Sequence, residues 1–322
     1  MKQYLRHTLV IVLTAGFAAA ASAQVDLSGR WRKENFQDFT DSTTGPFPSD
    51  FTGIPLNEQG RKAAQSHSAS SLSQLQRQCQ PWLVHYVNEG LFGFRMWATT
   101  NDQLSGKVTA WHMSGWHDRM PTTIVVDGSP PPSPLALHTH GGYSTGVWKG
   151  NTLITTTTHI KDGYLKRNGV PSSNQETFRM FITRHGNRLT VTSIVRDPVY
   201  LDGPYPITQV YTLDPGADAA EAPMHCSPAT EASGLASGYE SAAWLPGKNP
   251  TLTYMQEHYN IPFSAAMGGI ETMFPEYQKE LQGKYKIPAQ YCTQYCCGTS
   301  TGGGGLSPFT FDKRVLQCRA QL

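Results

Sequence analysis

Hydrophobic and polar residues alternate with a period of two from Leu91 onward, which is the pattern of β-strands with one buried face. Turn signals interrupt the pattern at short intervals, at Ser105-Gly106, Asp127-Gly128, Gly150-Asn151 and Gly186-Asn187. Strands separated regularly by Gly and Asn turns are typical of a meander that closes as a barrel or packs as a sandwich. We predict a mainly β domain over residues 24–215, an antiparallel up-and-down barrel.

Two hairpins in this region can be aligned residue by residue, because a two-residue Gly-Asn turn fixes which residues lie opposite each other. Around Gly150-Asn151 the alignment pairs Trp148 with Leu153, Ser144 with Thr157, and Gly142 with His159. Around Gly186-Asn187 it places six apolar side chains on one buried face: Phe178, Met180, Ile182, Leu189, Val191 and Val195. Each hairpin is therefore predicted to give one face to the core.

Outside the central strands the pattern predicts a first strand over 25–32 and a short helix over 57–66. Asn249-Pro250 supplies an N-cap and a proline at the first helical position, for a helix that runs to Tyr259. A further helix is expected over 275–281. The predicted organisation after the barrel is a linker (216–243), a helical segment (244–283) and a Cys-rich tail (284–322).

The first 23 residues have the layout of a secretory signal peptide. Lys2 and Arg6 precede an uncharged apolar stretch over 8–20, and Ala21-Ser22-Ala23 gives the small-x-small pattern of a cleavage site. The apolar stretch is short for a membrane span, so a cleaved signal is favoured over an N-terminal anchor. We expect export across a bacterial inner membrane to a periplasmic or secreted location.

Charge argues against some partners. Without residues 1–23, which hold Lys2 and Arg6, the chain has 24 basic and 24 acidic side chains. A protein that binds phosphates is expected to have a basic excess, so nucleic acid and anionic membrane surfaces are disfavoured as partners. Aromatic residues make up 11% of the chain and charged residues 16%, which suits a domain with a real core.

Six cysteines, an even number, indicate disulfides in an oxidising compartment. Cys79 and Cys226 flank the β-rich region, and we predict that they pair with each other. The other four leave three possible connectivities: Cys292, Cys296, Cys297 and Cys318. A zinc site in the tail is the alternative, although the spacing Cys292-x3-Cys296-Cys297 fits no standard ligand pattern.

Two short motifs carry a resemblance. Gly29-x-Trp31 and Gly146-x-Trp148 resemble the Gly-x-Trp strands of lipocalin- and avidin-like (calycin-style) barrels. The resemblance implies an interior pocket for a small, largely apolar ligand. It extends over about the first 215 residues, and the roughly 100 residues that follow have no counterpart in a simple lipocalin. Residues 139–200 also resemble a set of secreted bacterial proteins of unassigned function.

Histidines form the constellation most suited to chemistry. His138 and His140 are two residues apart, so in an extended strand they point the same way. The hairpin alignment places Ser144 on their face and brings His159 within side-chain reach of His140. We therefore predict a site of four candidate catalytic side chains: His138, His140, His159 and Ser144.

Three interpretations of these histidines are open. They are ligands of a zinc or copper ion (His138, His140 and His159), acid–base groups that move a proton, or hydrogen-bonded polar residues at a strand end. A serine hydrolase is disfavoured because Gly-Tyr-Ser144-Thr-Gly is followed by a strand, whereas a nucleophile elbow leads into a helix.

The sequence therefore predicts an exported lipocalin-like protein that binds a small apolar or aromatic molecule in a barrel pocket. The alternative is a periplasmic isomerase, lyase or hydrolase that uses the histidines, with no cofactor or with a single metal ion. The candidate pocket residues are Trp111, Tyr143, Trp148, Thr155, Thr157 and Arg196.

Overall fold

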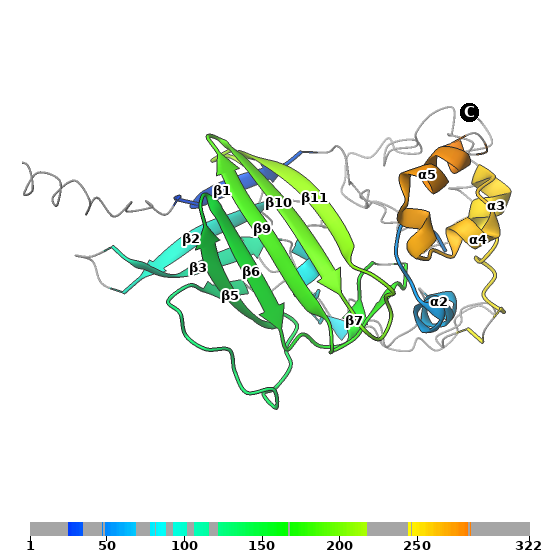
Figure 1. Cartoon of the computed structure of the whole chain (residues 1–322), viewed down its shortest axis with the longest axis horizontal. Coiled ribbons are helices and arrows are strands. Elements are labelled where there is room, and N and C mark those ends of the chain that lie inside the picture. Colours follow the sequence, from blue (N-terminus) through cyan, green and yellow to red (C-terminus); the bar gives the residue numbers. More distant parts are fainter. Residues whose placement is uncertain are drawn as a thin grey trace, which may run out of the picture.

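Nine strands form a closed barrel (Figure 1). The computed structural model of the protein describes residues 25–34, 47, 49–68, 78–80, 82–87, 93–101, 106–115, 122–166, 168–217, 244–245, 247–282 and 284. The barrel strands are β1 (Gly29–Lys33), β2 (Phe94–Thr100), β3 (Val108–Gly115), β4 (Thr122–Val125), β5 (Tyr143–Lys149), β6 (Thr152–Thr158), β9 (Thr177–His185), β10 (Arg188–Arg196) and β11 (Tyr205–Leu213). Since β1 pairs with both β2 and β11, the sheet closes on itself, and the sandwich alternative is wrong.

Both hairpin alignments are confirmed within the strands, whereas the predicted Gly142–His159 pair is not formed because β5 begins at Tyr143 and β6 ends at Thr158. β5 and β6 pair with Trp148 opposite Leu153 and Ser144 opposite Thr157. β9 and β10 pair around the Gly186-Asn187 turn, and their six predicted apolar side chains are all buried. The register follows from the turn, because Gly150 and Gly186 both adopt the positive φ that a primed turn requires.

One pair of neighbouring strands is parallel, which corrects the predicted antiparallel meander. β4 and β5 run in the same direction, with Ile124 opposite Ser144 and Val125 opposite Thr145. Strands in a closed barrel cannot alternate in direction all the way round if their number is odd, so nine strands require one such pair. A parallel pair needs a long crossover, and residues 126–142 provide it.

The barrel interior is lined by large apolar side chains. Along β10 buried and partly exposed residues alternate, as expected for a strand with one face inward. Trp31, in the Gly29-x-Trp31 motif, is fully buried, and its Nε1 donates to the Leu27 carbonyl at 3.0 Å. The largest buried side chains of the barrel include Trp111, Phe94, Phe178 and Tyr211. This packing supplies most of the hydrophobic free energy that holds the barrel together.

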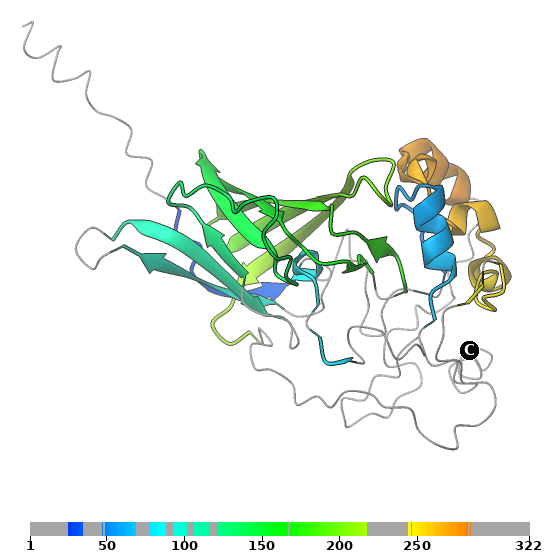
Figure 2. The same cartoon turned by 90° about the horizontal axis from the view of Figure 1, so that it is seen from below.

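Short helices lie beyond one end of the barrel (Figures 1 and 2). They are α2 (Glu58–Gln65), α3 (Tyr254–Tyr259), α4 (Phe263–Ala266), α5 (Pro275–Gln282) and the 3₁₀ turn η3 (Ile270–Met273). Backbone hydrogen bonds join residues before α2 to the later helices, from Phe51 to Ala266 at 2.8 Å and from Gly269 to Ile54 at 2.8 Å. The segment before α2 and the segment from α4 to η3 are therefore hydrogen-bonded to each other, although they are far apart in the sequence.

Two of the three predicted helices begin near their expected positions. Asn57 caps α2, since its Oδ1 accepts from the Gly60 amide at 2.8 Å, and α5 begins at Pro275. The helix expected from Asn249 begins only at Tyr254. Asn249 still caps the backbone, since its Oδ1 accepts from the Thr251 amide at 3.0 Å, but residues 250–253 form turns and not the first turn of the helix.

Several predictions fall outside the described residues. These are the signal peptide, nearly all of the 216–243 linker, the Cys-rich tail after residue 284, and five of the six cysteines. Cys79 is described and is not a free thiol, while its pairing with Cys226 stays a prediction. Within the described ranges, no helix has the length and apolar character needed to cross a membrane.

Burial of His67 gives a testable link between pH and stability. Removal from water lowers the pKa of His67 from 6.5 to about 4, and its ring packs edge-on to Tyr164 at 5.2 Å. The unfolded chain therefore binds a proton between pH 6.5 and 4 that the folded chain does not. Over that window, acidification should cost up to about 1.4 kcal/mol of unfolding free energy per pH unit.

Urea unfolding at several pH values checks this expectation. His67→Phe keeps an aromatic ring against Tyr164 but cannot titrate, so its stability should fall less steeply below pH 6.5 than that of the wild type. His185→Phe, at the exposed tip of the β9–β10 hairpin, serves as the control and should keep the wild-type slope. Equal slopes for wild type and His67→Phe would contradict the prediction.

Candidate functional site

One interior layer of the barrel combines apolar and polar side chains. Following the register from strand to strand, Trp111 lies opposite Ile124, Ile124 opposite Ser144, and Ser144 opposite Thr157. The same line continues through three further strands to Phe178, Val195 and Tyr205. All seven side chains are buried. We call these seven residues the Trp111 layer.

Polar atoms of this region are only partly satisfied. The hydroxyls of Ser144 and Thr157 bond to each other at 2.7 Å, and Thr155 Oγ1 accepts from the Met180 amide at 3.2 Å. Within the described part of the chain, the buried Nε1 of Trp111 has no hydrogen-bond partner. A buried donor without a partner costs about 1–3 kcal/mol, so this atom is a place where a ligand acceptor would be favoured.

The other predicted pocket residues are distributed over both faces. Thr155 and Thr157 face inward, as predicted, and Trp148 is half-buried near the β5–β6 turn. Tyr143 lies out of phase with the buried Ser144, and its hydroxyl donates to the Pro130 carbonyl at 3.4 Å. Arg196 is exposed at the end of β10. Tyr143 and Arg196 therefore do not join the interior layer.

The predicted extended strand through His138 and His140 does not form. β5 begins only at Tyr143, and Gly142 has a φ of +63°, a left-handed conformation that turns the chain. His159 likewise adopts a φ of 57° directly after β6. Because the alternation of side chains ends at both points, the histidines do not share a face with Ser144, Thr155 and Thr157.

Two of the three histidines nevertheless meet. The ring centroids of His138 and His159 are 5.2 Å apart. Carbonyl oxygens only accept hydrogen bonds, so His138 Nδ1 donates to Ile160 at 2.8 Å and His159 Nε2 donates to Ser133 at 3.0 Å. His159 Nδ1 also lies 2.9 Å from the Thr158 hydroxyl. In its neutral form, His138 then carries its lone pair on Nε2, for which the described residues provide no partner.

His140 is not part of this ring contact. Its backbone carbonyl accepts from the Val84 amide at 3.0 Å, and its half-buried ring has a pKa lowered by burial and by the nearby Lys161 cation. Among the residues that the structure describes, no three His, Cys, Asp or Glu side chains are arranged to hold a metal ion. The described residues therefore do not assemble the predicted site of His138, His140 and His159 for zinc or copper.

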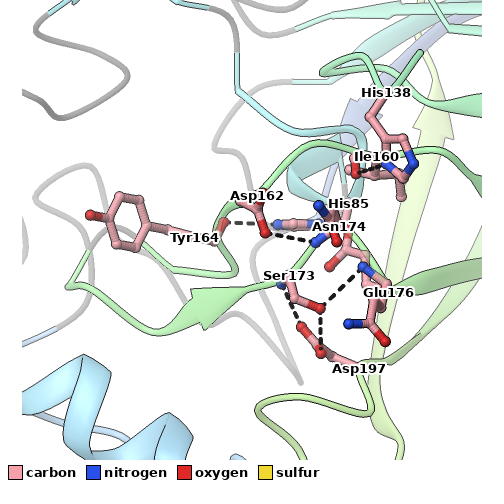
Figure 3. Close-up of polar contacts among 10 residues, drawn as sticks. His85, His138, Ile160, Asp162, Tyr164, Ser173, Asn174, Glu176 and Asp197 are labelled. Carbon is pink, nitrogen blue, oxygen red and sulfur yellow. Dashed lines mark hydrogen bonds and ion pairs between the residues drawn. The ribbon is translucent and has the colours of Figure 1, made fainter.

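A buried His–Glu pair, absent from the predictions, lies at the end of the barrel where β9 begins. His85 lies in the 3₁₀ turn η2 (Val84–Val87), and Glu176 directly precedes β9. Their side chains are 1% and 0% exposed, and Nδ1 of His85 lies 3.0 Å from Oε1 of Glu176. His85 Nε2 lies 2.9 Å from the Tyr164 carbonyl oxygen, in the short strand β7 (Gly163–Tyr164) (Figure 3).

The hydrogen bonds of this pair fix its proton count. His85 Nε2 must donate, because the Tyr164 carbonyl can only accept. One further proton then lies between Nδ1 and Glu176 Oε1, either on the ring as imidazolium facing carboxylate or on the carboxyl group. In both arrangements the pair is neutral overall. The second carboxyl oxygen, Oε2, is buried and accepts no hydrogen bond from the described residues.

A second buried carboxylate holds the neighbouring backbone. Asp197 accepts from the amide and hydroxyl of Ser173 at 2.6 and 2.8 Å, next to β8 (Pro171–Ser172) (Figure 3). It also accepts from the amides of Val199 and Tyr200, at 2.9 and 3.3 Å. Asp197 therefore anchors the β7–β8 ribbon to the end of β10 and forms no ion pair with Arg196.

Comparison with known proteins identifies no relative. No protein-family model, curated protein or solved structure matches the chain. The geometry of the site is therefore the basis for a functional proposal.

Proposed function

We propose that this barrel binds a small, apolar or aromatic molecule in its interior, at the Trp111 layer. The observation that carries the proposal is the buried Trp111 Nε1, which lacks a partner among the described residues. It belongs to a layer that also contains the buried apolar side chains of Ile124, Phe178 and Val195. A layer that is mostly apolar with a few polar groups has the composition typical of small-molecule sites.

The proposed binding mode is that of lipocalins, but this barrel differs from theirs in two respects. Lipocalin barrels have eight strands, whereas this barrel has nine and one parallel pair. The crossover over 126–142 that the parallel pair requires also carries His138 and His140. The fold thus places a histidine-bearing loop next to the start of β5.

We further propose that the protein acts outside the cytoplasm after loss of residues 1–23, with neither nucleic acid nor membrane as partner.

Native mass spectrometry of the protein purified from its bacterial host tests the proposal. A small molecule of one-to-one stoichiometry that is released on denaturation is the expected result. Incubation with the released molecule also separates binding from turnover: an unchanged molecule supports binding, and an altered one supports catalysis. A protein that carries no ligand and binds no apolar aromatic probe would overturn the proposal.

Substitution of Trp111 should weaken this binding about tenfold. Trp111→Phe keeps the aromatic bulk and removes the indole N–H, so a ligand loses one hydrogen bond worth about 1.4 kcal/mol. Fluorescence titration with 6-propionyl-2-dimethylaminonaphthalene, an apolar ketone, provides the measurement. Trp97→Phe is the matched control. Trp97 lies in the neighbouring strand β2, opposite His112 and on the outer face, and its ring stacks on the His112 ring with 5.2 Å between the centroids. Equal losses in both variants would contradict a role for the Trp111 N–H.

A second candidate function is proton transfer by His138. The observation that favours it is the hydrogen bond from His138 Nδ1 to the Ile160 carbonyl, which leaves the lone pair on Nε2 of a partly exposed residue. An imidazole held in this tautomer is suited to act as a general base. His159 is the positioning neighbour in this scheme, since both of its ring nitrogens are already engaged.

A further inference from the structure

We propose that Glu176 Oε2 accepts a hydrogen bond from a hydroxyl group of the bound molecule, so that the ligand is a neutral phenol or alcohol. This inference rests on the proposed binding function and adds the chemical class of the ligand. Three observations carry it: the direction of Glu176, its unpartnered oxygen, and the charge of the His85–Glu176 pair.

Glu176 belongs to the inward-facing line of β9. Phe178, Met180 and Ile182 occupy every second position of this strand and are fully buried. Glu176 continues the same phase by one step and is buried as well. Its partner His85 lies edge-on to Phe178, with 6.3 Å between the ring centroids. The carboxyl group therefore lies at the end of the barrel next to the Trp111 layer, to which Phe178 belongs.

The two oxygens of this carboxyl group have different surroundings. Oε1 is engaged by His85 Nδ1 at 3.0 Å, whereas Oε2 is buried without a donor among the described residues. Buried carboxyl oxygens are normally hydrogen-bonded, and an unpartnered one requires a reason. A donor on a ligand in the adjacent layer supplies that reason. Oε2 is an acceptor whether the shared proton resides on His85 or on Oε1.

Charge selects a neutral donor over a cation. The His85–Glu176 pair holds one proton between its members and is neutral overall, so it offers no net negative charge to an ammonium group. Lys166 adds a positive charge at this end of the barrel, with Nζ 5.9 Å from the Tyr205 ring centroid. Lys166 interacts electrostatically with Asp50, whose pKa is raised overall because burial outweighs the lowering effect of the Lys166 charge. A buried ammonium would be uncompensated here, whereas a hydroxyl adds no charge.

Three fluorescent probes of similar size test the selection in the wild-type protein. They are 2-naphthol, 2-methoxynaphthalene and 2-naphthylmethylammonium. We expect 2-naphthol to bind at least about tenfold more tightly than the methyl ether, which lacks the donor, and than the ammonium. Equal affinity for naphthol and ether would overturn the inference and leave the proposed binding function intact. Failure of all three probes, together with no co-purified molecule, would instead remove the binding function itself.

Two variants assign the preference to Glu176. Glu176→Gln directs its amide N–H₂ to His85 Nδ1 and its carbonyl oxygen into the site, so the preference for naphthol should remain within about threefold of wild type. Glu176→Met fills similar space without an acceptor, and the preference should fall to about one. Persistence of the preference in Glu176→Met, or its loss in Glu176→Gln, would overturn the assignment. If the methionine variant does not fold, the wild-type ratio and the glutamine variant decide the question.

Discussion

Replacing Asp197 by alanine should lower the free energy of unfolding by about 4 kcal/mol. This carboxylate is buried and accepts four hydrogen bonds, from the Ser173 amide and hydroxyl and from the amides of Val199 and Tyr200. Hydrogen bonds to a charged group are worth about 1.5–3 kcal/mol, and each buried donor left unsatisfied adds a penalty. The loss also releases the β7–β8 ribbon, whose Tyr164 carbonyl orients His85.

Urea unfolding with Asp127→Ala as the matched control isolates the contribution of burial. Asp127 forms the same type of turn, since its Oδ1 accepts from the amide two residues ahead, in Ser129, at 2.8 Å, but it is exposed. Its replacement should cost less than about 1 kcal/mol. A similar cost for both variants would contradict the network as the source of stability.

Gly93→Ala should lower the free energy of unfolding by about 3 kcal/mol, because it disturbs the pairing of β1 with β2. A methyl group at Gly93 would overlap the backbone carbonyl of Trp31. Trp31 and Phe94 lie opposite each other across this pair, so the strands must move apart to accept the extra carbon. Overpacking against backbone is costly because backbone atoms cannot rotate away.

The matched control for this substitution is Gly141→Ala. Gly141 has no atom within 4 Å of an added Cβ, and its φ is not in the left-handed range, so its replacement should be nearly neutral. Thermal and urea unfolding of the two variants should therefore differ by several degrees and by about 3 kcal/mol. Unchanged stability in Gly93→Ala would mean that β1 and β2 do not approach as closely as the structure has them.

The barrel hairpins were predictable because their signals are local. Gly150-Asn151 and Gly186-Asn187 each specify a two-residue turn, and a turn of known length sets every cross-strand pair that follows. The inward positions of Ser144, Thr155 and Thr157 follow from that register alone. Period-two patterning also predicted the mainly β architecture, while the parallel β4–β5 pair depends on the number of strands in the closed barrel.

The candidate site was less predictable because its contacts are distant or irregular. His85 and Glu176 are 91 residues apart, and no local pattern joins a histidine in an apolar 3₁₀ turn to a carboxylate before a strand. One signal was present: Glu176 is in phase with the buried positions 178, 180 and 182, where a charged residue is unusual. The predicted face shared by the histidines and Ser144 does not form, and the reason is local. Gly142 and His159 adopt left-handed conformations that turn the chain where the prediction continued the strands.

The position of β1 has a consequence for the growing chain. The ribosome makes this strand first, yet its two neighbours are β2 and β11, and Trp31 lies opposite Leu213 at the far end of the barrel sequence. Translation delivers the N-terminal part of a domain before its last partner exists. A nascent chain that stops before Tyr205 would have eight of the nine strands and two unpaired edges, β1 and β10. Open edges recruit other chains, so the time between the first strand and the last is when this protein is most exposed to misassembly.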